Sequence, residues 1–154
     1  MTLLNISRRC LVKIEIANEE LIAYSNNSLI PEKFSLIGVT SLNFSMNQLT
    51  SLPTALPEGL EVLWCFDNSL TDLPLLPKRL KVLSCFWNKI KTLPALPESL
   101  KSLSCSYNQL TELPFLPEGL VALYCNNNPL EYVPFFKEKP SFLTVSNRSF
   151  VFGS

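Results

Sequence analysis

Leucines and other apolar residues recur in this chain at a fixed period of 20 residues, separated by the same polar positions each time. Three consecutive units share the pattern LPxLPxxLxxLxCxxNxLxx: residues 73–92, 93–112 and 113–132. The preceding unit, 52–72, has the same pattern with one extra residue in its first half. A fixed period in this range indicates a repeat architecture in which each unit buries its apolar face against its neighbours. The chain is therefore predicted to be a solenoid.

Each part of the unit predicts a local structure. In LxxLxC, apolar and free positions alternate, which is typical of a short strand whose leucines and cysteine point inward. Equivalent strands stacked in parallel at about 4.8 Å place each leucine and each cysteine above the next. The asparagine ends the strand, and its amide can satisfy backbone groups that the turn leaves unpaired. The two prolines of LPxLP disfavour helix, so the return leg is expected to be extended or polyproline-like.

We therefore predict a right-handed coil with a parallel sheet on its concave side, an extended convex side and little helix. Residues 1–154 are interpreted as one domain with about seven parallel strands. The repeat region is placed at residues 21–133. Its template asparagines are Asn27, Asn47, Asn68, Asn88, Asn108 and Asn128.

The two ends are predicted to be caps. Residues 1–20 form the N-terminal cap, in which Val12, Ile14 and Ile16 alternate as in a strand. A turn at 17–20 would make a hairpin whose second strand, 21–25, is also the first strand of the solenoid. Residues 134–154 are read as a degenerate last repeat and C-terminal cap. This cap holds a last strand at 142–145 and the aromatic residues Phe135, Phe136, Phe142, Phe150 and Phe152.

This unit resembles the leucine-rich repeats, a fold conventionally classed as an α/β horseshoe. It is most similar to the 20-residue repeats of secreted bacterial effectors of the YopM and IpaH type, over residues 39–133. Those effectors usually carry an aliphatic residue at the cysteine position, and they tend to begin with a helical hairpin where this chain has LVKIEI. The IpaH type adds a C-terminal ubiquitin-ligase domain. This sequence ends at Ser154, which leaves no room for that domain, so its catalytic activity is not expected here.

Charge and hydrophobicity along the chain argue against binding to nucleic acid or membranes and against a secretory signal. The formal charge is zero and the sequence pI is about 6.3, so the basic signature of a nucleic-acid binder is missing. No apolar run approaches the roughly 20 residues of a membrane-spanning helix, so no membrane association is expected. Arg8 and Arg9 interrupt the short apolar start, and Lys13 and Glu15 follow, which does not match a secretory signal. The expected location is the cytoplasm, or a host cell reached through a specialised secretion system.

The cysteines follow the repeat. Cys65, Cys85, Cys105 and Cys125 are spaced 20 apart, and Cys10 lies outside the series with no role assigned. A row of thiols at about 4.8 Å intervals cannot surround one zinc ion, so we interpret them as small core residues and expect no metal. The chain has no histidine and no nucleophile, phosphate-binding or paired-carboxylate motif. We therefore expect neither a cofactor nor enzymatic activity.

The positions that the template leaves free carry the candidate site. They place six aromatic residues on or beside the concave face: Trp64, Phe66, Phe86, Trp87, Tyr107 and Tyr124. Folding does not require aromatic residues there, and exposed apolar patches often mark interaction sites. Alternatively, Phe66 and Phe86 pack at the rim between coils. The basic residues Lys78, Arg79, Lys81, Lys89, Lys91 and Lys101 are read as a solvated surface rather than a basic patch.

The sequence favours a non-catalytic recognition module that binds a partner protein through this aromatic face, as a bacterial effector acting on host proteins. One alternative is the substrate-recognition part of a ubiquitin ligase without its catalytic domain. Another is binding of carbohydrate or single-stranded nucleic acid by aromatic stacking, although the neutral charge weighs against nucleic acid. The identity of the partner and the oligomeric state stay open.

Overall fold

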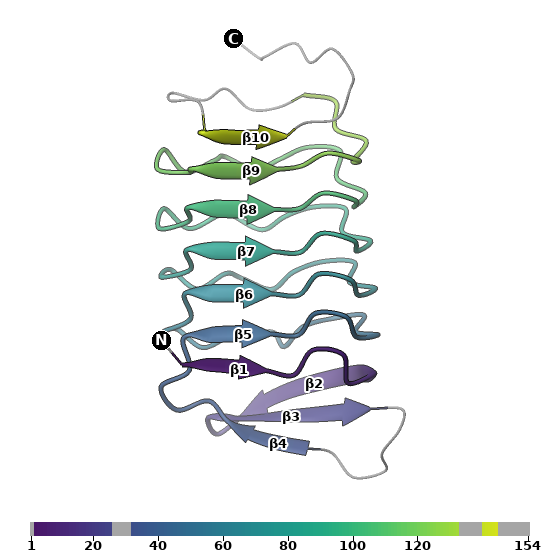
Figure 1. Ribbon diagram of the computed structural model, residues 1–154, viewed down its shortest axis with the longest axis vertical. Coiled ribbons are helices and arrows are strands. Elements are labelled where there is room, and N and C mark those ends of the chain that lie inside the picture. Colours follow the sequence, from purple (N-terminus) through teal and green to yellow (C-terminus); the bar gives the residue numbers. More distant parts are fainter. Residues whose placement is uncertain (1, 26–31, 133–139, 145–154) are drawn as a thin grey trace.

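The fold is a stack of short coils built on one long parallel sheet. The computed structural model describes residues 2–25, 32–132 and 140–144. Within these residues no helix is long and apolar enough to span a lipid bilayer. Figure 1 shows the strands lying one above another along the long axis, with the return legs behind them.

The main sheet has seven parallel strands in the order β1-β5-β6-β7-β8-β9-β10. Their bounds are β1 Leu3–Asn5, β5 Ser41–Asn43, β6 Val62–Trp64, β7 Val82–Ser84, β8 Ser102–Ser104, β9 Ala122–Tyr124 and β10 Phe142–Thr144. The register follows the repeat, because Leu63 pairs with Leu83, Leu83 with Leu103 and Leu103 with Leu123. The leucine-rich-repeat solenoid predicted from the sequence is confirmed.

The interior is filled by the template positions of successive coils. The leucine at the middle of each strand is fully buried from Leu42 to Leu123. The cysteine that follows each strand is also fully buried, and in the β5 coil Phe44 takes its place. Because each coil contributes the same side chains, every layer of the core packs against a near copy of itself.

A ladder of asparagine side chains joins the coils where the chain leaves each strand. Asn108 illustrates it: its Oδ1 accepts a hydrogen bond from the Ile90 amide of the preceding coil at 2.9 Å. Its Nδ2 donates to the carbonyls of Cys85 at 3.0 Å and Cys105 at 3.1 Å. Asn68, Asn88 and Asn128 repeat the same bonds. The predicted ladder is therefore present, and each rung connects two adjacent coils.

The return legs are extended, as their prolines predict. Residues 73–77, 93–97 and 113–117 contain no helix or strand. Each leg ends in a tight turn, in which the leucine amide bonds the carbonyl of the proline three residues before it, as in Leu80 to Pro77 at 3.0 Å. The glutamates that follow Pro57, Pro97 and Pro117 lie in these turns.

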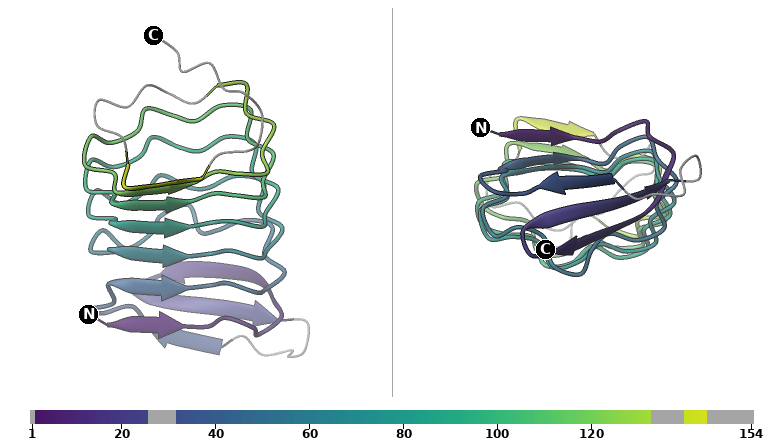
Figure 2. Two further views of the ribbon diagram at one scale, coloured as in Figure 1. Left: turned by 45° about the horizontal axis from the view of Figure 1, so that its top comes forward. Right: turned by 90° about the horizontal axis from the view of Figure 1, so that it is seen from below.

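A small antiparallel sheet forms the N-terminal cap. It consists of β2 Leu11–Ala17, β3 Glu20–Ser25 and β4 Glu32–Ser35, in the order β2-β3-β4. The predicted hairpin is present, with Asn18 and Glu19 at positive φ in its turn. One face buries Leu11, Ile14 and Leu21 against the core. Seen from the N-terminal end of the stack, the small sheet covers the open end of the solenoid (Figure 2, right).

The prediction that residues 21–25 begin the solenoid was wrong. The two-residue turn makes β3 antiparallel to β2, and β4 pairs with its other edge, so β3 belongs to the cap sheet. The first solenoid strand is β1, which pairs in parallel with β5 at a spacing of 38 residues. The cap is inserted where the first coil would have its return leg. Asn27, proposed as the first template asparagine, lies outside the described residues.

The expectations for the C-terminal end are met in part. Strand β10 confirms the predicted last strand over Phe142–Thr144, paired in parallel with β9. Phe142 is 61% exposed rather than buried as part of a closing cluster. Val145, Phe135, Phe136, Phe150 and Phe152 lie outside the described residues, so the proposed aromatic cap stays a prediction.

Replacing Asn108 with alanine is expected to destabilise the protein by about 1–3 kcal/mol, because it leaves the Ile90 amide without its acceptor and removes one of the two asparagine hydrogen bonds to each of the Cys85 and Cys105 carbonyls. Urea unfolding followed by circular dichroism measures this change. Gln109→Ala is the matched control, since that neighbouring side chain is exposed. Equal midpoints for the two variants would contradict a stabilising role for the ladder.

Candidate functional site

The outward positions of the sheet form columns that run across the strands. One column holds the last residue of each strand, including Trp64, Ser84, Ser104 and Tyr124, which the pairing places side by side. Two residues further along each coil, Phe66 and Phe86 begin the turn. Trp87 and Tyr107 follow in the next column. The register therefore brings residues 20 positions apart into contact on one surface.

Four of the six predicted residues form a continuous chain of ring contacts. Phe66 and Phe86 stack with their ring centroids 4.4 Å apart and their planes inclined by 8°. Phe86 meets Trp87 edge to face at 5.7 Å, and Trp87 meets Tyr107 in the same way at 5.8 Å. Such geometries are the favoured ones for aromatic pairs. We call these four residues the aromatic cluster.

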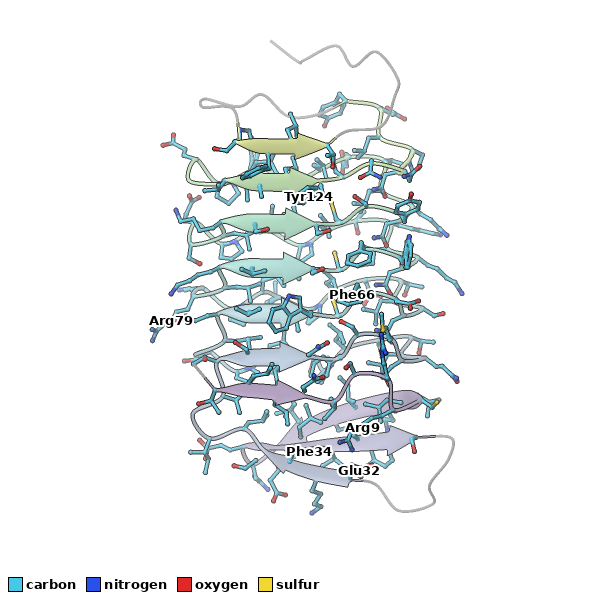
Figure 3. The ribbon with its side chains drawn as sticks, in the orientation of Figure 1. Arg9, Glu32, Phe34, Phe66, Arg79 and Tyr124 are labelled. Carbon is cyan, nitrogen blue, oxygen red and sulfur yellow. The ribbon has the colours of Figure 1, made fainter. Side chains whose placement is uncertain are left out.

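The other two predicted residues lie beside the cluster. Tyr124 lines a shallow pocket together with Phe86, Trp87 and Tyr107. Trp64 lies at the end of β6, two residues before Phe66, and makes no ring contact with another aromatic residue in the described part of the chain. Figure 3 shows Phe66 and Tyr124 near the ends of their strands. Five of the six residues are thus joined by direct contact or a shared pocket, and Trp64 flanks them.

Two members of the aromatic cluster, Trp87 and Tyr107, differ from Phe66 and Phe86 in backbone conformation. Residues at the second position after the buried cysteine or phenylalanine all have positive φ: Met46, Asp67, Trp87, Tyr107 and Asn127, with φ between 52° and 57°. This left-handed region suits glycine, asparagine and aspartate, and it disfavours bulky side chains. Asp67 and Asn127 follow that preference. Met46, Trp87 and Tyr107 do not, and the two aromatic residues expose 51% and 49% of their surface.

The pocket beside the cluster has polar members that the sequence did not single out as binding residues. Its volume is about 240 Å³, and its lining adds Ser104, Ser106 and Asn126 to the aromatic residues. Asn126 Oδ1 accepts hydrogen bonds from Ser106 Oγ at 2.6 Å and Thr144 Oγ1 at 3.3 Å. The period of 20 places Ser106 next to Asn126, but nothing in the pattern reveals that they bond.

Charged residues lie at the opposite end of the strands. Glu61 accepts hydrogen bonds from Lys81 at 2.9 Å and Arg79 at 3.4 Å. The hydrogen bond from Lys81 is the main reason why the pKa of Glu61 lies below its usual value. Figure 3 shows Arg79 where the strands begin and Phe66 where they end. These pairs are solvent-exposed and contribute little to stability.

The four repeat cysteines are core residues, as expected, whereas Cys10 is only partly buried. Burial raises the pKa of the Cys65 and Cys125 thiols to about 12, and it raises the pKa of Cys85 and Cys105 well above the ordinary value. A thiol with so high a pKa is protonated at neutral pH and is a poor nucleophile or metal ligand. Among the described residues no group of three or more histidine, cysteine or acidic side chains has the geometry to bind a metal ion.

A second groove lies on the side of the return legs, between the turns at 54–59 and 75–79, with a volume of about 660 Å³. Three of its lining residues, Leu56, Leu76 and Pro77, are template leucines and prolines. Leu75 at its rim is 81% exposed, and Phe115 two coils further on is 97% exposed. We favour the aromatic surface as the site because four of its rings contact one another there, and tryptophan and tyrosine are the residue types that most often anchor protein interfaces.

The parallel strands, extended return legs and asparagine ladder define a leucine-rich-repeat protein. The Leucine Rich Repeat family profile matches residues 99–120, which cover the turn before β8, that strand and the return leg after it. No curated protein matches the sequence.

Solved structures similar to this chain include a domain of a Shigella effector and YopM from two Yersinia species. The leucine-rich-repeat domain of a Shigella effector is 44% identical, with a TM-score of 0.62, over 64% of this chain and 44% of that one. YopM from Yersinia enterocolitica is 36% identical, with a TM-score of 0.57, over 70% of this chain and 26% of its own. YopM from Yersinia pestis is 29% identical, with a TM-score of 0.57, over 76% of this chain and 44% of its own. The expected resemblance is confirmed, and the chain spans less than half the length of each structure.

The buried thiols predict a loss of stability at alkaline pH. The folded-state pKa of Cys65, about 12, lies above the reference value of 9.0, so this contribution is complete below pH 9.0 and is lost as pH rises toward 12. Each such thiol lowers the free energy of unfolding by about 1.4 kcal/mol per pH unit in that window. Urea unfolding at several pH values measures the slope.

The double variant Cys85→Val/Cys105→Val tests whether the thiols cause this loss, because it removes two of the four buried thiols and keeps apolar side chains in the core. Its slope above pH 9.0 should be clearly shallower than that of the original protein, whereas tyrosine and lysine titration affects both proteins alike. Identical slopes would show that the thiols do not cause the alkaline loss.

Proposed function

We propose that this chain is a non-catalytic recognition module that binds a partner protein through the aromatic cluster, Trp64 and Tyr124. We further propose that it acts as a bacterial effector on host proteins, delivered into the host cell by a specialised secretion system. Leucine-rich-repeat domains generally bind proteins, and their fold is typically non-catalytic. The rigid sheet holds the cluster in place, because each ring projects from a strand end or turn that the ladder fixes.

The observation that carries the proposal is the placement of Trp87 and Tyr107. Both occupy left-handed backbone positions, where a non-glycine residue costs about 1–2 kcal/mol relative to the right-handed region. Equivalent coils carry Arg8, Met46, Asp67 and Asn127 there, so the fold accepts small polar residues but does not require them. Both aromatic side chains leave about half their surface in solvent and therefore gain only part of the stabilisation that full burial would give. Recognition of a partner accounts for them better than folding does.

The similar structures support the effector part of the proposal. The Shigella and Yersinia pestis proteins are described as effectors, and the former is a leucine-rich-repeat domain. Identities of 44% and 36% over roughly two thirds of this chain indicate more than a shared architecture. Fusing the chain to a reporter enzyme that is active only inside a host cell, and expressing it in a bacterium with such a secretion system, tests delivery. A signal no higher than that of a secretion-deficient strain would contradict delivery.

Replacing Trp87 and Tyr107 with asparagine should separate binding from folding. Asparagine is the residue that this column already carries at Asn127, and it tolerates positive φ. The relief of backbone strain offsets the lost ring contacts, so we expect the unfolding free energy to stay within about 1 kcal/mol of the original. Capture of proteins from host-cell lysate by the immobilised double variant should fall at least tenfold, as read by quantitative mass spectrometry.

Leu75→Ala/Phe115→Ala is the control, because both side chains are exposed hydrophobic residues on the return legs. This variant should capture the same proteins as the original chain. If the asparagine variant retains capture, or if the return-leg variant loses it, the aromatic surface is not the recognition site. A large drop in stability of the asparagine variant would instead assign the two rings to the fold.

A further inference from the structure

The chemistry of the aromatic pocket indicates what kind of segment it binds. None of the residues that line it carries a charge. A charged group entering a site walled by Phe86, Trp87 and Tyr107 would lose water without gaining a counter-ion, which is unfavourable. The basic residues Arg79 and Lys81 lie at the other end of the strands and already bond Glu61. The pocket therefore favours an uncharged occupant.

Hydrogen-bond donors dominate the polar part of the same surface. The indole of Trp87 can only donate, and the hydroxyls of Tyr107 and Tyr124 can also donate. Asn126 uses its Oδ1 to accept from Ser106 and Thr144, and within the described residues its two N–H groups have no acceptor. A ligand matched to this surface presents carbonyl acceptors and apolar rings, and it needs few donors of its own.

Among protein segments, a proline-rich one has those properties. Proline lacks the backbone N–H, and the polyproline II conformation leaves every carbonyl free of internal hydrogen bonds. Other proline-rich segments bind aromatic-lined grooves for the same reasons. Resting on the proposed function, we propose that the aromatic surface binds an extended, uncharged, proline-rich segment of the partner in the polyproline II conformation.

The spacing of the coils matches the repeat of such a segment. Polyproline II has three residues per turn and rises about 3.1 Å per residue, so equivalent prolines are about 9.3 Å apart. Two coils are about 9.6 Å apart at a strand spacing of about 4.8 Å. A segment lying across the strands with one proline in the pocket at Tyr107 therefore places a second proline, three residues away, over Trp64 and Phe66. This arrangement brings Trp64 into the site.

Binding of a capped decaproline peptide tests the inference, measured by isothermal titration calorimetry and by the change in tryptophan fluorescence. We expect a Kd between about 10 μM and 1 mM, because one short rigid segment fills only part of the surface. Trp87→Asn and Tyr107→Asn should each weaken binding at least tenfold, and Asn126→Ala about threefold. Leu75→Ala/Phe115→Ala should not change the Kd. A glycine–serine peptide of equal length is the control for sequence-independent binding.

Cellohexaose and a short oligothymidine are titrated in parallel. Either ligand binding more tightly than decaproline would overturn the proposal, because aromatic faces also stack on sugars and bases. No saturation by decaproline below about 5 mM, or an unchanged Kd in Trp87→Asn, would overturn it as well. If lysate capture still depends on Trp87 and Tyr107 in that case, the proposed function stands and only the polyproline assignment fails. If capture is also independent of them, both fail.

Discussion

The hydrogen bonds of the asparagine ladder are the interaction on which the rest of this structure depends. Each amide joins the carbonyls of two successive coils and accepts from an amide of the preceding one, as Asn88 does with Cys65, Cys85 and Leu70. Without those bonds, buried backbone groups at each turn would lack partners. The ladder fixes the register of the coils, and the register in turn aligns the core leucines and the outward columns.

The same geometry constrains what the surface can present. Each described coil from β5 to β9 turns through a left-handed residue just before its asparagine, so that column is a recurrent feature of the fold. Small polar residues satisfy the column at least cost; Met46 departs from that choice, and so do Trp87 and Tyr107. Their departure places two half-exposed rings beside Phe86, where they extend the stack that begins at Phe66. A conformational constraint of the scaffold thus coincides with the surface that we assign to recognition.

The sequence predicts the features that depend on periodicity. Leu63, Cys85 and Asn108 lie where the pattern places them, because one template position has one environment in every coil. The first coil was not predicted, because its equivalent residues lie 38 positions further along the chain instead of 20. The equivalent pairs are Leu4 and Leu42, Asn5 and Asn43, Ser7 and Ser45, and Leu11 and Leu49. The cap sheet inserted at that point breaks the period. The positive φ of Trp87 and the bond between Ser106 and Asn126 also leave no mark in a pattern of apolar and polar letters.

The uniformity of the ladder makes the coil a unit of evolutionary change. Removing residues 93–112 would join the coil of Asn88 to that of Asn128, and the new junction would need the same three bonds as the old ones. Gain or loss of one unit therefore alters the length of the sheet by about 4.8 Å while leaving the closure of the core intact. The outward residues of that unit would move with it as a block. Recombination between repeats can therefore lengthen or shorten the recognition surface in one step. Each resulting sequence still encodes a complete set of coils and can fold.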